Sequence, residues 1–141
     1  AVQSSTPEVP VGPSTGLLDR YETETGSGEL NVKNGTDGDG VVILADLDDK
    51  PLLAAYIRSG ESYRLTGIPN GEYRLFFSKG DRWDDEKKAF TRRVSRQRFE
   101  DTFVFTSTAT SYSVWDVTLY GVAGGNAGAE DVADDQFPTL P

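Results

Sequence analysis

The chain has 141 residues, of which 36% are hydrophobic and 26% charged, and its formal net charge is −9. It contains no Cys, Met or His, which excludes thiol chemistry, thiolate or imidazole metal sites, the usual serine triad and histidine acid–base catalysis. The negative charge argues against nucleic-acid and anionic-membrane partners, and no apolar run reaches the roughly 18 residues that a membrane-spanning helix needs.

The composition changes along the chain and divides it into three parts. Residues 1–16 are a Pro-, Ser- and Thr-rich arm, residues 17–122 carry the pattern of a folded domain, and residues 123–141 are an acidic, Gly-rich tail. A chain of this length is enough for one domain with one core. The first residues read Ala-Val-Gln, as in a mature product after signal cleavage, so we expect an extracellular or cell-surface protein.

Short β-branched and aromatic runs are separated by Gly, Asn, Asp and Pro every eight to twelve residues, as in all-β sandwiches. We predict a seven- to eight-stranded antiparallel β-sandwich with extended N- and C-terminal tails. In chain order the expected strands cover residues 29–33, 41–45, 52–58, 62–66, 72–77, 90–98, 103–106 and 111–120.

Two pairs of these strands are expected to be hairpins. The first joins 29–33 to 41–45 through a Gly- and Asp-rich turn, and the second joins 62–66 to 72–77 through residues 67–71. In the second pair, Tyr73, Leu75 and Phe77 alternate with polar residues and with Phe76, so they should share one face. Apolar residues on both faces of 111–120 predict a central or doubly covered strand.

The run Ile68-Pro69-Asn70-Gly71-Glu72-Tyr73-Arg74-Leu75 resembles the corresponding hairpin of prealbumin-like seven-stranded sandwiches. These include carboxypeptidase regulatory-like domains and collagen-adhesin B-type repeats. A longer pattern, from Gly28-Glu29-Leu30 to Gly125-Asn126-Ala127, is similar to an uncharacterised bacterial β-domain of hypothetical proteins. The resemblance implies a structural or adhesive role and carries no assigned chemistry.

Acidic turns suggest a cation site and also permit a simpler interpretation. Asp37, Asp39 and Asp46 offer the oxygen ligands that calcium prefers, although Gly35 stands where the loop signature places its first ligand. The alternative is turn chemistry in solvated loops. Carboxylate pairs for glycoside hydrolysis would need a cleft, and these acids lie in turns, so we predict a protein that is not an enzyme and needs no cofactor.

Two further residues invite carbohydrate hypotheses. Asn34 begins an Asn-Gly-Thr sequence that matches a glycan attachment site on a turn, although an Asn-Gly turn explains the same residues. Trp83, among Asp81, Asp84 and Asp85, could be a sugar-binding platform, or it could cap the edge of the core.

Charge distribution suggests how the tails bind. Six basic residues within twelve positions form what we call the basic strip: Lys87, Lys88, Arg92, Arg93, Arg96 and Arg98. The C-terminal tail carries the opposite charge at Asp131 and Asp134, and Phe137 as an apolar anchor. We expect this tail to dock on the strip in its own or a neighbouring copy, while the arm lies along a sheet edge through Val9 and Val11. A solvated strand pair is the alternative.

Two functional hypotheses follow. The first is a non-enzymatic structural or interaction module, a subunit of an extracellular filament or surface assembly, in which copies form a homo-oligomer through their tails. The alternative is a carbohydrate- or calcium-binding accessory module of a larger secreted protein.

Overall fold

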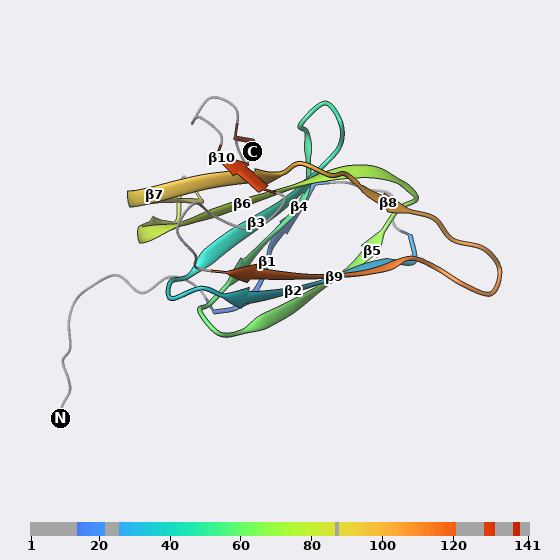
Figure 1. Cartoon of the computed structure of the whole chain (residues 1–141), viewed down its shortest axis with the longest axis horizontal. Coiled ribbons are helices and arrows are strands. Elements are labelled where there is room, and N and C mark those ends of the chain that lie inside the picture. Colours follow the sequence, from blue (N-terminus) through green and yellow to red (C-terminus); the bar gives the residue numbers. More distant parts are fainter. Residues whose placement is uncertain (1–13, 22–25, 87, 121–128, 132–136, 139–141) are drawn as a thin grey trace.

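The computed structural model describes residues 14–21, 26–86, 88–120, 129–131 and 137–138. These residues form strands and no helix, and the strands lie in two sheets that make two layers (Figure 1). The predicted all-β fold is therefore confirmed. Within the described ranges, no helix is long and apolar enough to cross a membrane.

The larger sheet takes its two outer strands from the chain ends. Its main path follows the order β1-β4-β3-β6-β7-β10, with antiparallel pairing throughout. The strands are β1 (Gly16–Arg20), β4 (Pro51–Ile57), β3 (Gly40–Ala45), β6 (Gly71–Asp84), β7 (Ala89–Phe99) and β10 (Ala129–Asp131). A short strand, β8 (Phe103–Phe105), pairs with the start of β6.

The smaller sheet has the order β5-β2-β9, with β5 at Ser62–Ile68, β2 at Gly28–Gly35 and β9 at Val114–Tyr120. The β2–β9 pair is parallel. In the described part of the chain β9 pairs with β2 alone, and Val114 is 47% exposed. The prediction of a central or doubly covered last strand is therefore wrong.

Both predicted hairpins are replaced by crossings between the sheets. β2 lies in the smaller sheet while β3 lies in the larger one, and β5 and β6 are separated in the same way. Gly67 near the end of β5 and Gly71 at the start of β6 flank the connection between these strands, and their φ angles of 69° and 155° favour glycine. The Tyr73 hydroxyl closes this connection by donating a hydrogen bond to the Pro69 carbonyl at 2.8 Å.

The main core fills the space between the sheets. It includes Leu30 and Val32 from β2, and Tyr73, Leu75 and Phe77 from β6, all at most 6% exposed. The predicted alternation along β6 is confirmed, because Phe76 belongs to a different cluster on the opposite face. Alternating side chains of one strand thus contact two separate apolar layers.

The second core lies on the face of the larger sheet that points away from the smaller one. Its buried members are Val41, Ile43, Ala45, Ala54, Tyr56, Phe76 and Phe90. Because β3 contributes to both cores, all six of its residues are buried. Leu18 and Tyr21 near the N-terminus, and Phe137 near the C-terminus, pack against the second core as half-buried side chains. Segments from both chain ends therefore cover this apolar face.

Candidate interaction surface

The N-terminal segment forms one edge of the larger sheet. β1 pairs with β4 from Gly16 opposite Tyr56 to Arg20 opposite Leu53, with a bulge between Leu17 and Asp19. Beyond the strand, the Tyr21 amide donates to the Leu52 carbonyl at 2.8 Å. The segment is thus held by main-chain bonds as well as by its apolar side chains.

Side chains connect this edge to other parts of the fold. The Arg20 guanidinium donates to the Thr66 carbonyl at 2.6 Å, which reaches the end of β5. Asp19 accepts from Lys88 at 3.4 Å, and the Lys88 ammonium lies 5.7 Å from the centre of the Tyr21 ring. One residue of the basic strip therefore contacts the N-terminal segment, which the sequence did not indicate.

The C-terminal segment forms the other edge of the larger sheet. β10 runs antiparallel to β7, with Ala129 opposite Phe99, Glu130 opposite Arg98 and Asp131 opposite Gln97. Figure 1 shows this short strand beside β7 on the side away from β6. Within a single chain, β10 thus pairs with the end of β7 that carries Arg98, one residue of the basic strip.

Phe137 continues this contact on the second core. Its ring meets that of Phe76 edge to face, with centroids 5.6 Å apart and an interplanar angle of 83°. Arg98 is the cross-strand neighbour of Phe76, so a basic side chain shares that face. Pro138, which follows, is buried.

The remaining predicted contact residues have different outcomes. Arg92 is exposed and pairs in register with Asp81, whereas Arg96 and Arg98 are half-buried. For Arg93 and Asp131 the structure places the backbone only, in β7 and β10. Lys87, Val9, Val11 and Asp134 lie outside the described residues.

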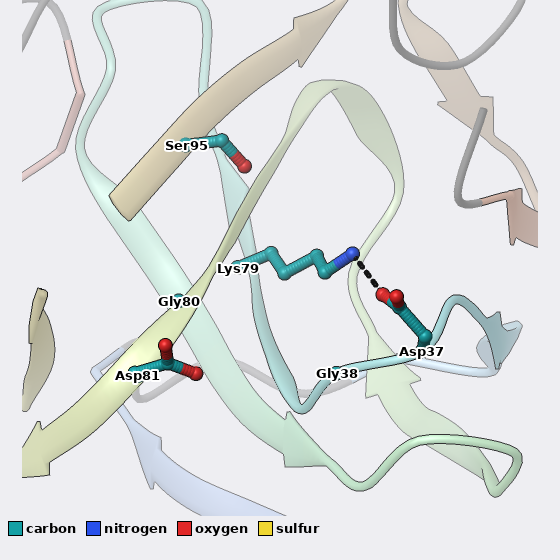
Figure 2. Close-up of a pocket in the computed structure, with 6 residues that line it drawn as sticks. All are labelled: Asp37, Gly38, Lys79, Gly80, Asp81 and Ser95. Atoms are coloured by element: carbon teal, nitrogen blue, oxygen red, sulfur yellow. Dashed lines mark hydrogen bonds and ion pairs between the residues drawn. The ribbon is translucent and has the colours of Figure 1, made fainter. Parts of the chain in front are cut away.

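A shallow pocket of about 330 Å³ lies between the β2–β3 connection and the β6–β7 pair, lined by Asp37, Gly38, Lys79, Gly80, Asp81 and Ser95 (Figure 2). Lys79 extends across it and donates to Asp37 at 2.5 Å. This hydrogen bond holds the pKa of the exposed Asp37 carboxyl below its ordinary range. Because Asp37 already has a cationic partner, the pocket is a poor cation site.

The three predicted calcium ligands do not converge. Asp39 precedes β3 and Asp46 follows it, so the length of the strand separates them. Asp39 accepts from the Tyr56 hydroxyl at 2.8 Å, and Asp46 accepts from the backbone amides of Asp48 and Lys50. No group of three acidic residues able to hold a metal occurs in the described ranges. The turn interpretation accounts for these aspartates.

Asn34 is a buried structural residue and no glycan attachment point. Its exposure is 0%, and its Nδ2 donates to the carbonyls of Gly38 and Ile57, each at 2.9 Å. Its Oδ1 accepts from the Thr36 amide at 3.0 Å and from the Thr36 hydroxyl at 2.6 Å. Burial of the nitrogen that would carry the sugar leaves no room for a glycan, so the predicted attachment site is wrong.

Trp83 caps the second core. Its ring packs edge to face against Tyr56 and Phe90, with centroids 5.0 Å and 5.2 Å away, and its Nε1 donates to Asp85 at 3.3 Å. The interpretation of this residue as a core cap therefore fits its contacts better than a sugar platform does.

The fold and this surface define an all-β, two-sheet protein whose chain ends form the two edges of one sheet. Comparison with protein-family models, curated proteins and solved structures finds no match. The resemblance to prealbumin-like sandwiches stays a prediction.

Proposed function

We propose that this protein is a non-enzymatic structural or interaction module whose terminal segments join copies into an extracellular filament or surface assembly. The observation that supports the proposal most is that both edge strands of the larger sheet, β1 and β10, come from the chain ends. A terminal strand can pair with the same edge in its own chain or in a neighbour, because the main-chain hydrogen bonds are the same in both cases.

The C-terminal contact is suited to exchange. Among the described residues, three residue pairs join β10 to β7, a strand of 11 residues, so separation of these pairs costs few hydrogen bonds. Eight residues connect Tyr120 to Ala129, enough to span up to about 28 Å when extended. Without β10, β7 would present an open edge, which is a template for strand addition.

Charge favours a specific neighbour over random pairing. Net charge −9 makes copies repel one another at long range, whereas the acidic segment and the basic strip attract locally. A segment that passes from each copy to β7 of the next forms a head-to-tail contact, and a contact of this kind that does not close produces a filament.

Sedimentation velocity over a concentration series tests the proposal. The full chain is expected to form larger species as its concentration rises, while a chain that ends at residue 122 remains monomeric. Circular dichroism of the shortened chain must show retained β structure for the comparison to hold. A full chain that stays monomeric at all concentrations, and shows no filaments by electron microscopy, would sink the idea.

A further inference from the structure

The connection between β8 and β9 differs from the rest of the surface because it has no charge. Residues 103–115 contain no Asp, Glu, Lys or Arg, although 26% of the whole chain is charged. In Figure 1 this connection projects beyond both sheets. Four of the six exposed large hydrophobic side chains in the described residues lie within residues 103–115: Val104, Tyr112, Val114 and Trp115.

Backbone hydrogen bonds order this connection as a hairpin. Ser107 and Tyr112 form an antiparallel bridge, and the Ser113 amide donates to the Thr106 carbonyl at 3.0 Å. Near the tip, the Thr108 amide donates to the Ser111 carbonyl at 2.7 Å. The side chains of the hairpin therefore have fixed positions relative to one another.

Two cross-strand pairs of hydroxyl groups share one face of the hairpin, and Trp115 lies two residues beyond Ser113 on the same strand. The Trp115 indole nitrogen donates to the Val104 carbonyl at 2.9 Å, the Thr106 and Ser113 hydroxyls lie 3.5 Å apart, and those of Thr108 and Ser111 lie 2.9 Å apart. We call this row the hydroxyl–tryptophan strip: Trp115, Thr106, Ser113, Thr108 and Ser111. It presents an aromatic ring followed by two rungs of hydroxyl groups.

The Trp115 ring is available for an apolar contact. It is 38% exposed, and Phe103 supports it edge to face at 5.2 Å. Because the single N–H group of the indole is already bound to Val104, the ring has no further hydrogen to donate. A ligand would meet it by stacking.

The outer rung retains capacity for a hydrogen bond. The Thr108 hydroxyl accepts from the amides of Thr110 and Ser111 at 3.3 Å and 3.1 Å. Its own proton is then donated to the Ser111 hydroxyl, because a hydroxyl oxygen accepts at most two bonds. The Ser111 proton is left for an acceptor outside the hairpin.

We propose that the hydroxyl–tryptophan strip binds a neutral carbohydrate chain. A sugar ring has an apolar face of C–H groups that stacks on an aromatic side chain, and a rim of hydroxyls that matches the polar rungs. The lack of charge disfavours an ionic ligand. A stable protein interface buries about 800 Å² per partner, far more than one tryptophan and four small hydroxyl residues offer.

Retention of the full chain on insoluble neutral polysaccharides tests this inference, with cellulose, chitin and xylan as probes and acidic alginate as the charge control. We expect retention on at least one neutral probe and none on alginate. Trp115→Ala should weaken it by at least about tenfold, and Ser111→Ala, which spares the core, by about three- to tenfold. Leu47→Ser, at another exposed large hydrophobic residue, on the β3–β4 turn, is the control and should bind like the natural chain.

Three outcomes would overturn the inference. The first is a lack of retention on every neutral polysaccharide. The second is retention that survives both Trp115→Ala and Ser111→Ala. The third is a change in sedimentation of these variants without a change in retention, which would make the strip a contact between copies.

Discussion

Asn34 shows how one buried polar side chain holds the two sheets of this fold together. It is the penultimate residue of β2 in the smaller sheet, yet its amide nitrogen reaches the Ile57 carbonyl at the end of β4 in the larger sheet. All four hydrogen-bonding positions of the side chain are used. Its loss would leave carbonyl groups without a donor in an interior where water cannot replace it.

We predict that Asn34→Ala lowers the free energy of unfolding by at least about 2 kcal/mol, measured by urea denaturation. Asn31→Ala is the matched control, because Asn31 lies on the same strand with its hydrogen bonds to Asp116 and Arg64 near solvent. The control should lose less than about 1 kcal/mol. Equal losses in the two variants would contradict the role assigned to Asn34.

Ionisation of Tyr56 is expected to lower the stability of the protein at high pH. Burial raises the pKa of its hydroxyl above the ordinary value of about 10, and its hydrogen bond to Asp39 adds to this effect. The Tyr56 hydroxyl loses its proton at a lower pH in the unfolded chain than in the folded chain. Its contribution to the free energy of unfolding is therefore complete below about pH 10 and is lost as the pH rises further.

Tyr56→Phe removes this dependence. We expect the urea midpoint of the natural chain to fall more steeply between pH 10 and pH 11.5 than that of the variant. At pH 8 the variant should be the less stable of the two, because it lacks the hydrogen bond to Asp39. Parallel slopes above pH 10 would show that Tyr56 does not limit alkaline stability.

At the scale of strands, local pattern predicts the elements better than their partners. Alternation along residues 72–77 places Tyr73, Leu75 and Phe77 correctly because one strand's periodicity is a local property. The pairing of β2 with β5 and β9 depends on contacts distant in sequence. Glycine-rich turns such as 34–40 suit a hairpin and a crossing between sheets equally, so composition cannot distinguish them.

In the interaction surface, too, the sequence predicts some contacts and does not predict others. Opposite charges predict that the C-terminal tail meets the basic strip, and the described part of the tail, β10, pairs with the end of β7 that carries Arg98. The contact of Asp19 with Lys88 is less predictable, because each residue alone has the pattern of a solvated side chain. The sequence leaves both interpretations of Asn34 open because an Asn-Gly-Thr sequence is the same whether its turn is exposed or buried.

The contribution of the C-terminal segment can be measured at its aromatic anchor. Phe137→Ala removes the edge-to-face contact with Phe76 and uncovers part of the second core. Because Phe137 is only half-buried, we expect a loss of about 1–2 kcal/mol, below the 3–5 kcal/mol of a fully buried phenylalanine. Leu47→Ala, on an exposed turn, should cost less than about 0.5 kcal/mol. An unchanged stability of Phe137→Ala would mean that the segment contributes nothing to this face.

At the scale of the whole molecule, the chain ends complete the fold. The larger sheet carries an apolar layer on each face, and the smaller sheet covers only one of them. Leu18, Tyr21 and Phe137 help to cover the other. If these segments cover the second core of a neighbouring copy, as we propose, stability and assembly are linked.

Exchange of the C-terminal segment between copies is the central claim, and the absence of natural cysteine allows a direct measurement. Two variants, Arg98→Cys and Glu130→Cys, carry single thiols at positions opposite each other in the β7–β10 pair. Opposed residues of antiparallel strands have Cα separations of about 4.5–5.5 Å, within the range of a disulfide.

The two variants are mixed at high concentration and oxidised, and the products are identified by intact mass. We predict that the disulfide between the Arg98→Cys and Glu130→Cys chains forms in clear excess over the disulfide of a control mixture, in which Leu47→Cys replaces Glu130→Cys. Mixed and control products in equal, low yield would show that each segment stays on its own chain, and would contradict the claim.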